Sequence, residues 1–204
     1  MFEDILEYLA GVNWLSYFFY NILIALICVG FYYLMRGKSE KVKYYTILGI
    51  LIFGFFLHFA KLLLPEYRNE LPASIKDITF TTPCAISAMV FPFIYICKNK
   101  ALKDYFVVFG IISGILTLIF PLNIYGRSMF DIEVIRFYTA HLIIILAPLF
   151  TYIFKIHTLS KKWIKHTILL FLLVLLIIVI NNELFDILVL KETGEIQQLG
   201  QYFK

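Results

Sequence analysis

The chain has 204 residues, of which 61% are hydrophobic and only 16% are charged. An ordinary soluble domain is about half apolar and about a quarter charged, so this composition excludes a soluble protein. It indicates a polytopic membrane protein with a single domain, residues 1–204. The net charge of +4 comes from lysines and arginines in short loops, so we expect no nucleic-acid partner.

Six apolar segments are long enough to cross a bilayer, which takes about 20 apolar residues. The connections between them are short, and short connections place consecutive helices side by side in antiparallel directions. We therefore expect an all-α protein built as one bundle of six transmembrane helices. These helices should cover residues 14–35, 44–64, 78–97, 102–120, 134–155 and 166–188.

The distribution of lysine and arginine predicts how the bundle lies in the membrane. The loops after the first, third and fifth segments hold most of the basic residues and only two acidic ones, Glu40 and Asp104. Basic loops stay on the cytoplasmic side of a membrane. We therefore expect both the N-terminus and the C-terminus to face outward.

Polar side chains gather near the predicted outer ends of the apolar segments. Such one-sided clustering indicates a polar cavity that opens toward the outer leaflet. The alternative is that long side chains reach out to the membrane surface, which suits Lys61 and Arg136 but not the shorter Cys84 and His141. The residues of this cluster are His58, Lys61, Cys84, Arg136, His141, Asn181, Asn182 and Glu183.

His141 lies inside the fifth segment, in the apolar run from Glu133 to Phe150. An ionisable group at this depth must be hydrogen-bonded or hydrated, which makes it a candidate functional residue. The alternative is a histidine that holds two helices together by a hydrogen bond. The residues around His141 leave both interpretations open.

Cys84 follows Thr82 and Pro83, a pair that favours the start of a helix, with Thr82 as N-cap and Pro83 in the first helical position. A helix from Pro83 to Cys97 would be about 22 Å long, at about 1.5 Å per residue, whereas the hydrocarbon layer is about 30 Å thick. Cys84 would then lie in a recessed first turn, where free N–H groups favour the thiolate over the thiol. The alternative is a continuous, kinked helix with an inert cysteine. The three cysteines show no metal or disulfide spacing, and we expect no cofactor.

Two short segments resemble a known family. They read Thr-Pro-Cys-Ala-Ile-Ser-Ala at 82–88 and Phe-Tyr-Thr-Ala-His-Leu-Ile at 137–143. Both are similar to segments of the YwaF family of bacterial membrane proteins, which is related to a eukaryotic transmembrane acyltransferase that remodels ether phospholipids. The resemblance covers roughly residues 55–190. It implies a helical bundle in the bacterial plasma membrane, with Cys84 and His141 as a catalytic pair.

The chemistry that this resemblance implies is acyl transfer or acyl hydrolysis on a membrane lipid. Cys84 would give its proton to His141 and attack an ester carbonyl, and the resulting acyl-thioester would pass its acyl group to a lysophospholipid, another acceptor or water. Candidates for contact with the substrate are Thr81, Thr82, Ser87, Arg136, Tyr138, His58, Lys61 and Asn181.

Two other functions fit the same sequence. Six helices in 204 residues also suit the substrate-binding subunit of an energy-coupling-factor vitamin importer, which would hold a small molecule at the outer face. The predicted outward N-terminus is unusual for such a subunit. The other alternative is a membrane protein with a structural or assembly role and no chemistry.

Overall fold

The computed structural model describes residues 13–65, 67, 78–121 and 126–193. Within these residues the chain is helical and contains no strand, which confirms the all-α class. The α-helices are α2 (Trp14–Met35), α3 (Glu40–Phe59), α5 (Pro83–Ile96), α6 (Lys100–Ile119), α7 (Ile132–Ile153) and α8 (Ile164–Thr193), and two short 3-10 turns, η1 (Ala60–Leu63) and η4 (Lys161–Trp163), adjoin α3 and α8.

Polar residues directly before the helices explain where these helices begin. A side-chain oxygen at such a position accepts a hydrogen bond from a backbone N–H of the first turn, which would otherwise have no partner. The side chains of Asn13, Ser39, Asn99 and Asp131 make this bond at the starts of α2, α3, α6 and α7.

Five helices in the described part of the chain are long and apolar enough to cross a membrane, and α5 is shorter. The predicted helix over 78–97 is wrong in its first part, because α5 begins only at Pro83. Proline disfavours helical backbone in the residue before it, and Thr82 is accordingly extended, with φ −137° and ψ 157°. With 14 residues, α5 is about 21 Å long, so it is too short for a bilayer of about 30 Å.

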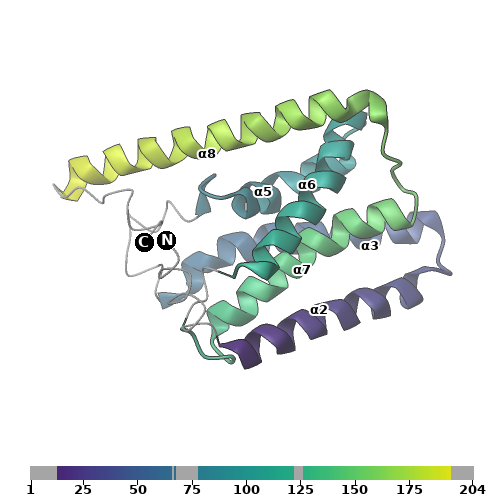
Figure 1. Cartoon of the computed structure of the whole chain (residues 1–204), viewed down its shortest axis with the longest axis horizontal. Coiled ribbons are helices and arrows are strands. Elements are labelled where there is room, and N and C mark those ends of the chain that lie inside the picture. Colours follow the sequence, from purple (N-terminus) through teal and green to yellow (C-terminus); the bar gives the residue numbers. More distant parts are fainter. Residues whose placement is uncertain (1–12, 66, 68–77, 122–125, 194–204) are drawn as a thin grey trace.

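The helices pack around α5, α6 and α7, while α2 and α8 lie on the outside (Figure 1). Helices that follow one another along the chain were expected to pack together, and this holds for α3 with α5, for α5 with α6 and for α6 with α7. This expectation is wrong for the two outer helices, because α2 packs mainly against α7 and α8 mainly against α6. The side chains of α8 are mostly exposed, whereas those of α7 are mostly buried.

Glycines let α6 approach α7 closely, which fixes the position of α6 beside the site described below. A Cβ atom added at Gly110 would overlap Pro148, and one added at Gly114 would overlap Ile145. Small residues allow membrane helices to pack backbone against backbone in this way.

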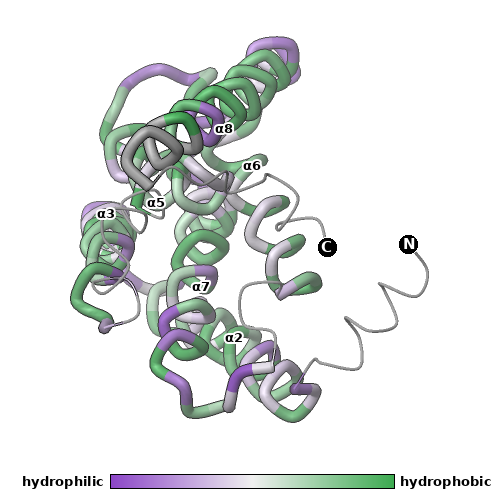
Figure 2. Tube along the Cα trace, turned by 90° about the vertical axis from the view of Figure 1, so that its left-hand side faces the viewer, coloured by the Kyte–Doolittle hydropathy of each residue, from purple (hydrophilic) through white to green (hydrophobic). Residues whose placement is uncertain are grey.

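The outside of the bundle is suited to lipid. Figure 2 shows that the helices are hydrophobic along most of their length, with hydrophilic residues concentrated near helix ends and in connections. Large apolar side chains such as Phe18, Leu26, Leu169 and Leu176 are exposed on α2 and α8. A water-exposed surface of this kind would be unfavourable, so the structure is that of a multi-pass membrane protein.

Candidate functional site

A cavity of about 610 Å³ lies inside the bundle, between α3, α5, α6, α7 and α8. We call it the central cavity. One end, the His58 end, is lined by His58, Lys61, Thr82 and Arg136, where α3 finishes and α5 and α7 begin. The opposite end, lined by Tyr105 with Phe109, Thr167 and Ile168, is called the Tyr105 end.

Cys84 lines the cavity from the first turn of α5. The predicted cap is confirmed, because the Thr82 hydroxyl oxygen accepts a hydrogen bond from the N–H of Ala85 at 3.1 Å, and Pro83 is the first helical residue. This cap fixes the residue at which α5 begins and therefore the position of the thiol along the bundle.

The Cys84 thiol has a partner on α6 that the sequence analysis missed. Its Sγ atom lies 3.3 Å from Oγ1 of Thr117, and the Thr117 hydroxyl donates to the carbonyl of Ser113 at 2.9 Å. A hydroxyl carries one hydrogen, so the thiol must be the donor in the bond to Thr117. The signal in the sequence was the pair Ser113 and Thr117, which are four residues apart and so lie on one face of an apolar helix.

His141 lines the same cavity from α7 and is 6% exposed. Its Nδ1 atom lies 2.7 Å from the carbonyl oxygen of Phe137, one turn earlier. A carbonyl can only accept, so Nδ1 carries the hydrogen and Nε2 of the neutral ring is left with a lone pair. This Nε2 atom is buried and has no hydrogen-bond partner. Buried polar atoms are rarely left unpaired, so His141 Nε2 needs a partner that the described residues do not supply.

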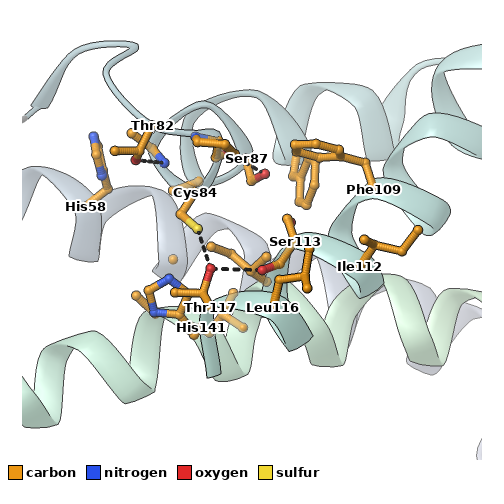
Figure 3. Close-up of a pocket in the computed structure, with 18 of the residues that line it drawn as sticks. His58, Thr82, Cys84, Ser87, Phe109, Ile112, Ser113, Leu116, Thr117 and His141 are labelled. Carbon is orange, nitrogen blue, oxygen red and sulfur yellow. Dashed lines mark hydrogen bonds between the residues drawn. The ribbon is translucent and has the colours of Figure 1, made fainter. Parts of the chain in front are cut away.

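The structure brings Cys84 and His141 to the same part of the cavity. Figure 3 shows the Cys84 side chain directed toward Thr117, with the His141 ring drawn next to Thr117 below Cys84. Three helices thus contribute one group each: a thiol from α5, a hydroxyl from α6 and an imidazole from α7. The hydrogen-bond partner of the thiol in this arrangement is Thr117.

Polar contacts occupy the His58 end. His58 is buried, and its Nε2 atom lies 3.1 Å from the carbonyl of Ile78, to which it must donate. Arg136 forms a salt bridge with Glu133, whose carboxylate is 2% exposed and also accepts a hydrogen bond from Tyr67 at 2.8 Å. The charge of Arg136 is therefore already balanced where it lines the cavity.

The other predicted contact residues divide into two groups. Ser87 lines the cavity, but its hydroxyl donates to the carbonyl of Pro83 at 2.8 Å. Tyr138, Asn181 and Thr81 lie outside the cavity lining.

Tyr138, Asn181 and Thr81 instead take part in contacts between different segments of the bundle. The Tyr138 ring stacks on Tyr20 of α2, with 4.4 Å between the ring centroids. Asn181 donates to the hydroxyl of Thr79 at 3.0 Å, and Asn182 donates to the carbonyl of Thr81 at 3.3 Å. The two asparagines thus tie α8 to the segment before α5.

No metal site accompanies the cavity in the part of the chain that the structure describes, where no group of three or more His, Cys, Asp or Glu side chains is placed to hold an ion.

Several apolar helices around an internal cavity define the class of this protein, a multi-pass membrane protein with a candidate site inside its bundle. A family model described as the TMEM164 family matches residues 9–190, which include Cys84 and His141. The chain belongs to this family. Comparisons with curated proteins and with solved structures found no match.

Proposed function

We propose that this protein is a lipid acyltransferase or acyl hydrolase of the bacterial plasma membrane, with Cys84 as nucleophile and His141 as general base. The observation that carries the proposal is the unpaired Nε2 atom of His141, which lines the same cavity as the Cys84 thiol. A base needs a free lone pair near the proton that it removes, and the hydrogen bond from Nδ1 to Phe137 leaves that lone pair on Nε2.

In the first half-reaction, the thiol leaves Thr117 and gives its proton to Nε2 of His141. The thiolate sulfur attacks the carbonyl carbon of an acyl ester, and the carbonyl oxygen becomes an oxyanion. When the C–O bond of the ester breaks, His141 returns its proton to the departing alkoxide. The products are an acyl-thioester on Cys84 and an alcohol, which is a lysolipid when the donor is a phospholipid.

The start of α5 offers a donor for the oxyanion. Proline has no N–H, so the first N–H of α5 belongs to Cys84 itself, and the Thr82 side chain caps Ala85 instead. The first N–H groups of a helix have no intrahelical acceptor, and an N–H aimed at a developing negative charge stabilises the transition state.

In the second half-reaction, the acceptor takes the place of the departed alcohol. Its hydroxyl gives a proton to His141 and attacks the thioester carbonyl, and the thiolate leaves and regains the proton. A lysophospholipid as acceptor gives acyl transfer, and water gives hydrolysis. The apolar walls of the cavity favour a lipid acceptor over water.

The test is detection of the acyl-thioester. We expect purified wild-type protein, incubated with phospholipid that carries a radiolabelled acyl chain, to acquire label that hydroxylamine removes. Cys84→Ala should acquire none, and His141→Ala should acquire it at least about 100-fold more slowly, which is the usual contribution of a general base. Cys28→Ala and Cys97→Ala are matched controls and should label like the wild type. Labelling of Cys84→Ala at the wild-type rate would contradict the proposal.

A second result would also overturn the catalytic proposal. If wild-type protein forms no thioester with any phospholipid class and instead holds a small molecule through purification, the protein is a binding or transport subunit. Mass spectrometry of the purified protein under native conditions distinguishes this outcome.

A further inference from the structure

The central cavity changes character along its length. Its charged lining residues in the described part of the chain, Lys61 and Arg136, are both at the His58 end. Beyond Ser87 and Ser113, toward the other end, the walls become mostly aliphatic and aromatic, with Phe91, Ile112 and Phe171 among them. Figure 3 shows this order, with His58 and Thr82 on one side of Cys84 and Phe109 and Ile112 on the other. A cavity that is polar at one end and apolar at the other fits an amphiphile with one hydrocarbon chain.

The apolar part has the depth of one lipid chain. Thr117, beside the thiol, and Tyr105, at the other end of the cavity, lie on the same helix. Their separation is about 18 Å along α6, at about 1.5 Å per residue. The hydrocarbon layer of a bilayer is about 30 Å thick, so a chain of one leaflet extends about 15 Å. The two lengths differ by only about 3 Å, so a chain whose carbonyl lies at Cys84 would end close to Tyr105.

Aromatic rings close this end. Tyr105 is 4% exposed and stacks on Phe109, with 4.9 Å between ring centroids and 14° between ring planes. Phe109 in turn contacts Phe171 of α8, with 5.6 Å between centroids. Rings that are held by stacking cannot move aside as easily as a methionine or leucine side chain, so they form a fixed floor.

We infer that the apolar part of the central cavity is a channel for a single acyl chain and that the Tyr105 ring sets the longest chain that it accepts. This inference depends on the proposed function in one respect only, which is that the bound chain is identified as the acyl group of the substrate. Tyr105 is then a specificity-determining residue, about 18 Å along α6 from Thr117 and with no part in the chemistry.

The test measures binding, not turnover. The full chain, purified in detergent, is labelled with a photoactivatable palmitate, and saturated fatty acids from octanoate to arachidate compete with the label. We expect affinity to rise with chain length, by about fourfold for each methylene that becomes buried, and to stop rising at a defined length. Tyr105→Ala should move that limit to longer chains. Tyr105→Phe keeps the ring and should leave the limit unchanged.

A second substitution, on α5, should shorten the channel. Ala88 lines the cavity one turn after Cys84, about 6 Å farther along α5. Ala88→Phe should therefore lower the length limit, and Ala88→Leu should lower it less and serves if the phenylalanine variant does not fold. Phe93→Ala is the control, because this ring is on α5 but exposed on the outside of the bundle. Unfolding temperature and gel-filtration profile confirm that each variant is folded.

The outcomes separate this inference from the proposed chemistry. A length limit that Tyr105→Ala and Ala88→Phe leave unmoved, or that Phe93→Ala moves equally, would overturn the channel even if the thioester forms. A wild-type protein that binds none of the fatty acids would overturn it as well. Binding with the expected shifts but without any acyl-thioester would support the channel and contradict only the catalytic proposal.

Discussion

At the scale of single residues, the candidate site depends on how hydrogens are distributed over three side chains. Thr117 donates to the carbonyl of Ser113, so its oxygen is placed to accept a hydrogen bond from the Cys84 thiol. His141 donates from Nδ1, so its other nitrogen can only accept. Under the proposed function, the thiol hydrogen would therefore have to turn from Thr117 toward Nε2 of His141.

This arrangement predicts how the three cysteines react. Cys28, Cys84 and Cys97 are all free and partly buried, so exposure alone does not favour one of them. We expect iodoacetamide to modify Cys84 first, because the thiolate is the reactive species and only Cys84 shares a cavity with an unpaired histidine nitrogen. His141→Ala should slow that modification by about 100-fold.

Labelling rates of the three thiols in detergent, measured by mass spectrometry at several pH values, check this prediction. Cys28 and Cys97 are internal controls, since His141→Ala should not change their rates. Equal and slow labelling of Cys84 with and without His141 would mean that His141 only packs between helices.

A second polar pair joins Asp104, near the start of α6, to His157 in the connection between α7 and α8, and it concerns stability. Asp104 is 3% exposed, and its carboxylate lies 2.5 Å from Nε2 of His157 and accepts a hydrogen bond from the N–H of Ser160 at 3.2 Å. These contacts fasten the connection between α7 and α8 to α6. Removing one partner of a buried ion pair leaves the other group buried without a partner for its charge, which lowers the stability of the fold.

We therefore expect His157→Ala to lower the free energy of unfolding by about 3 kcal/mol. His166→Ala removes an exposed histidine from α8 and should have little effect. Unfolding of the purified proteins in mixed detergent micelles, followed by circular dichroism, measures both changes. Equal stability of the two variants would show that the pair contributes nothing to the fold.

At the scale of the elements, α5 is the helix on which the site depends most. Its helical part is shorter than the hydrocarbon layer is thick, and its start is fixed by the Thr82 cap and by Pro83. Cys84 lies in its first turn, so any change in where α5 begins moves the thiol relative to α6 and α7. The cap should therefore matter to the site as well as to stability.

We expect Thr82→Ala to cost about 1 kcal/mol of stability, as loss of an N-cap usually does, and also to change the labelling rate of Cys84. Ser39→Ala is the matched control, because Ser39 caps α3 through the N–H of Val42. It should lower stability by a similar amount and leave Cys84 labelling unchanged. If both variants alter Cys84 labelling to the same extent, the effect is general loosening of the bundle rather than displacement of α5.

The outermost helix, α8, forms one wall of the central cavity through Thr167, Ile168, Phe171 and Leu175. It packs mainly against α6, and few of its side chains are buried. Two asparagine hydrogen bonds, from Asn181 and Asn182, hold it to the segment before α5. Under the proposed function, we expect a lipid chain to enter the cavity from the side, past this helix.

At the scale of the whole molecule, the membrane orientation is a prediction of the sequence that the fold leaves open. The basic loops after α2, α5 and α7 should face the cytoplasm, with both termini outside. Reporter fusions after Lys41, Lys100 and Lys162 should all be active as cytoplasmic fusions. One fusion that reports the outside would reverse this orientation and place the His58 end of the cavity at the cytoplasmic face.

The sequence by itself determined the class of the protein and the approximate extent of most helices, and it offered Pro83 as one of two possible starts of α5. Composition and segment length determine the first two, because a bilayer requires a fixed length of apolar helix. The third depends on Thr82 and Pro83, whose preferences act within one helical turn. Cys84 and His141 could be selected as candidates because polar groups are rare in such segments.

Only the tertiary structure decided what surrounds these candidates. Thr117 as partner of Cys84, Tyr138 on the α2 side of α7, and the pair of Asp104 with His157 all depend on which helices are neighbours and how each is rotated. Helices that are apolar on all sides carry little periodic signal for that rotation. Lipid also supplies no hydrophobic force that would favour one contacting face over another, so close packing at sites such as Gly110 and Gly114 makes the choice.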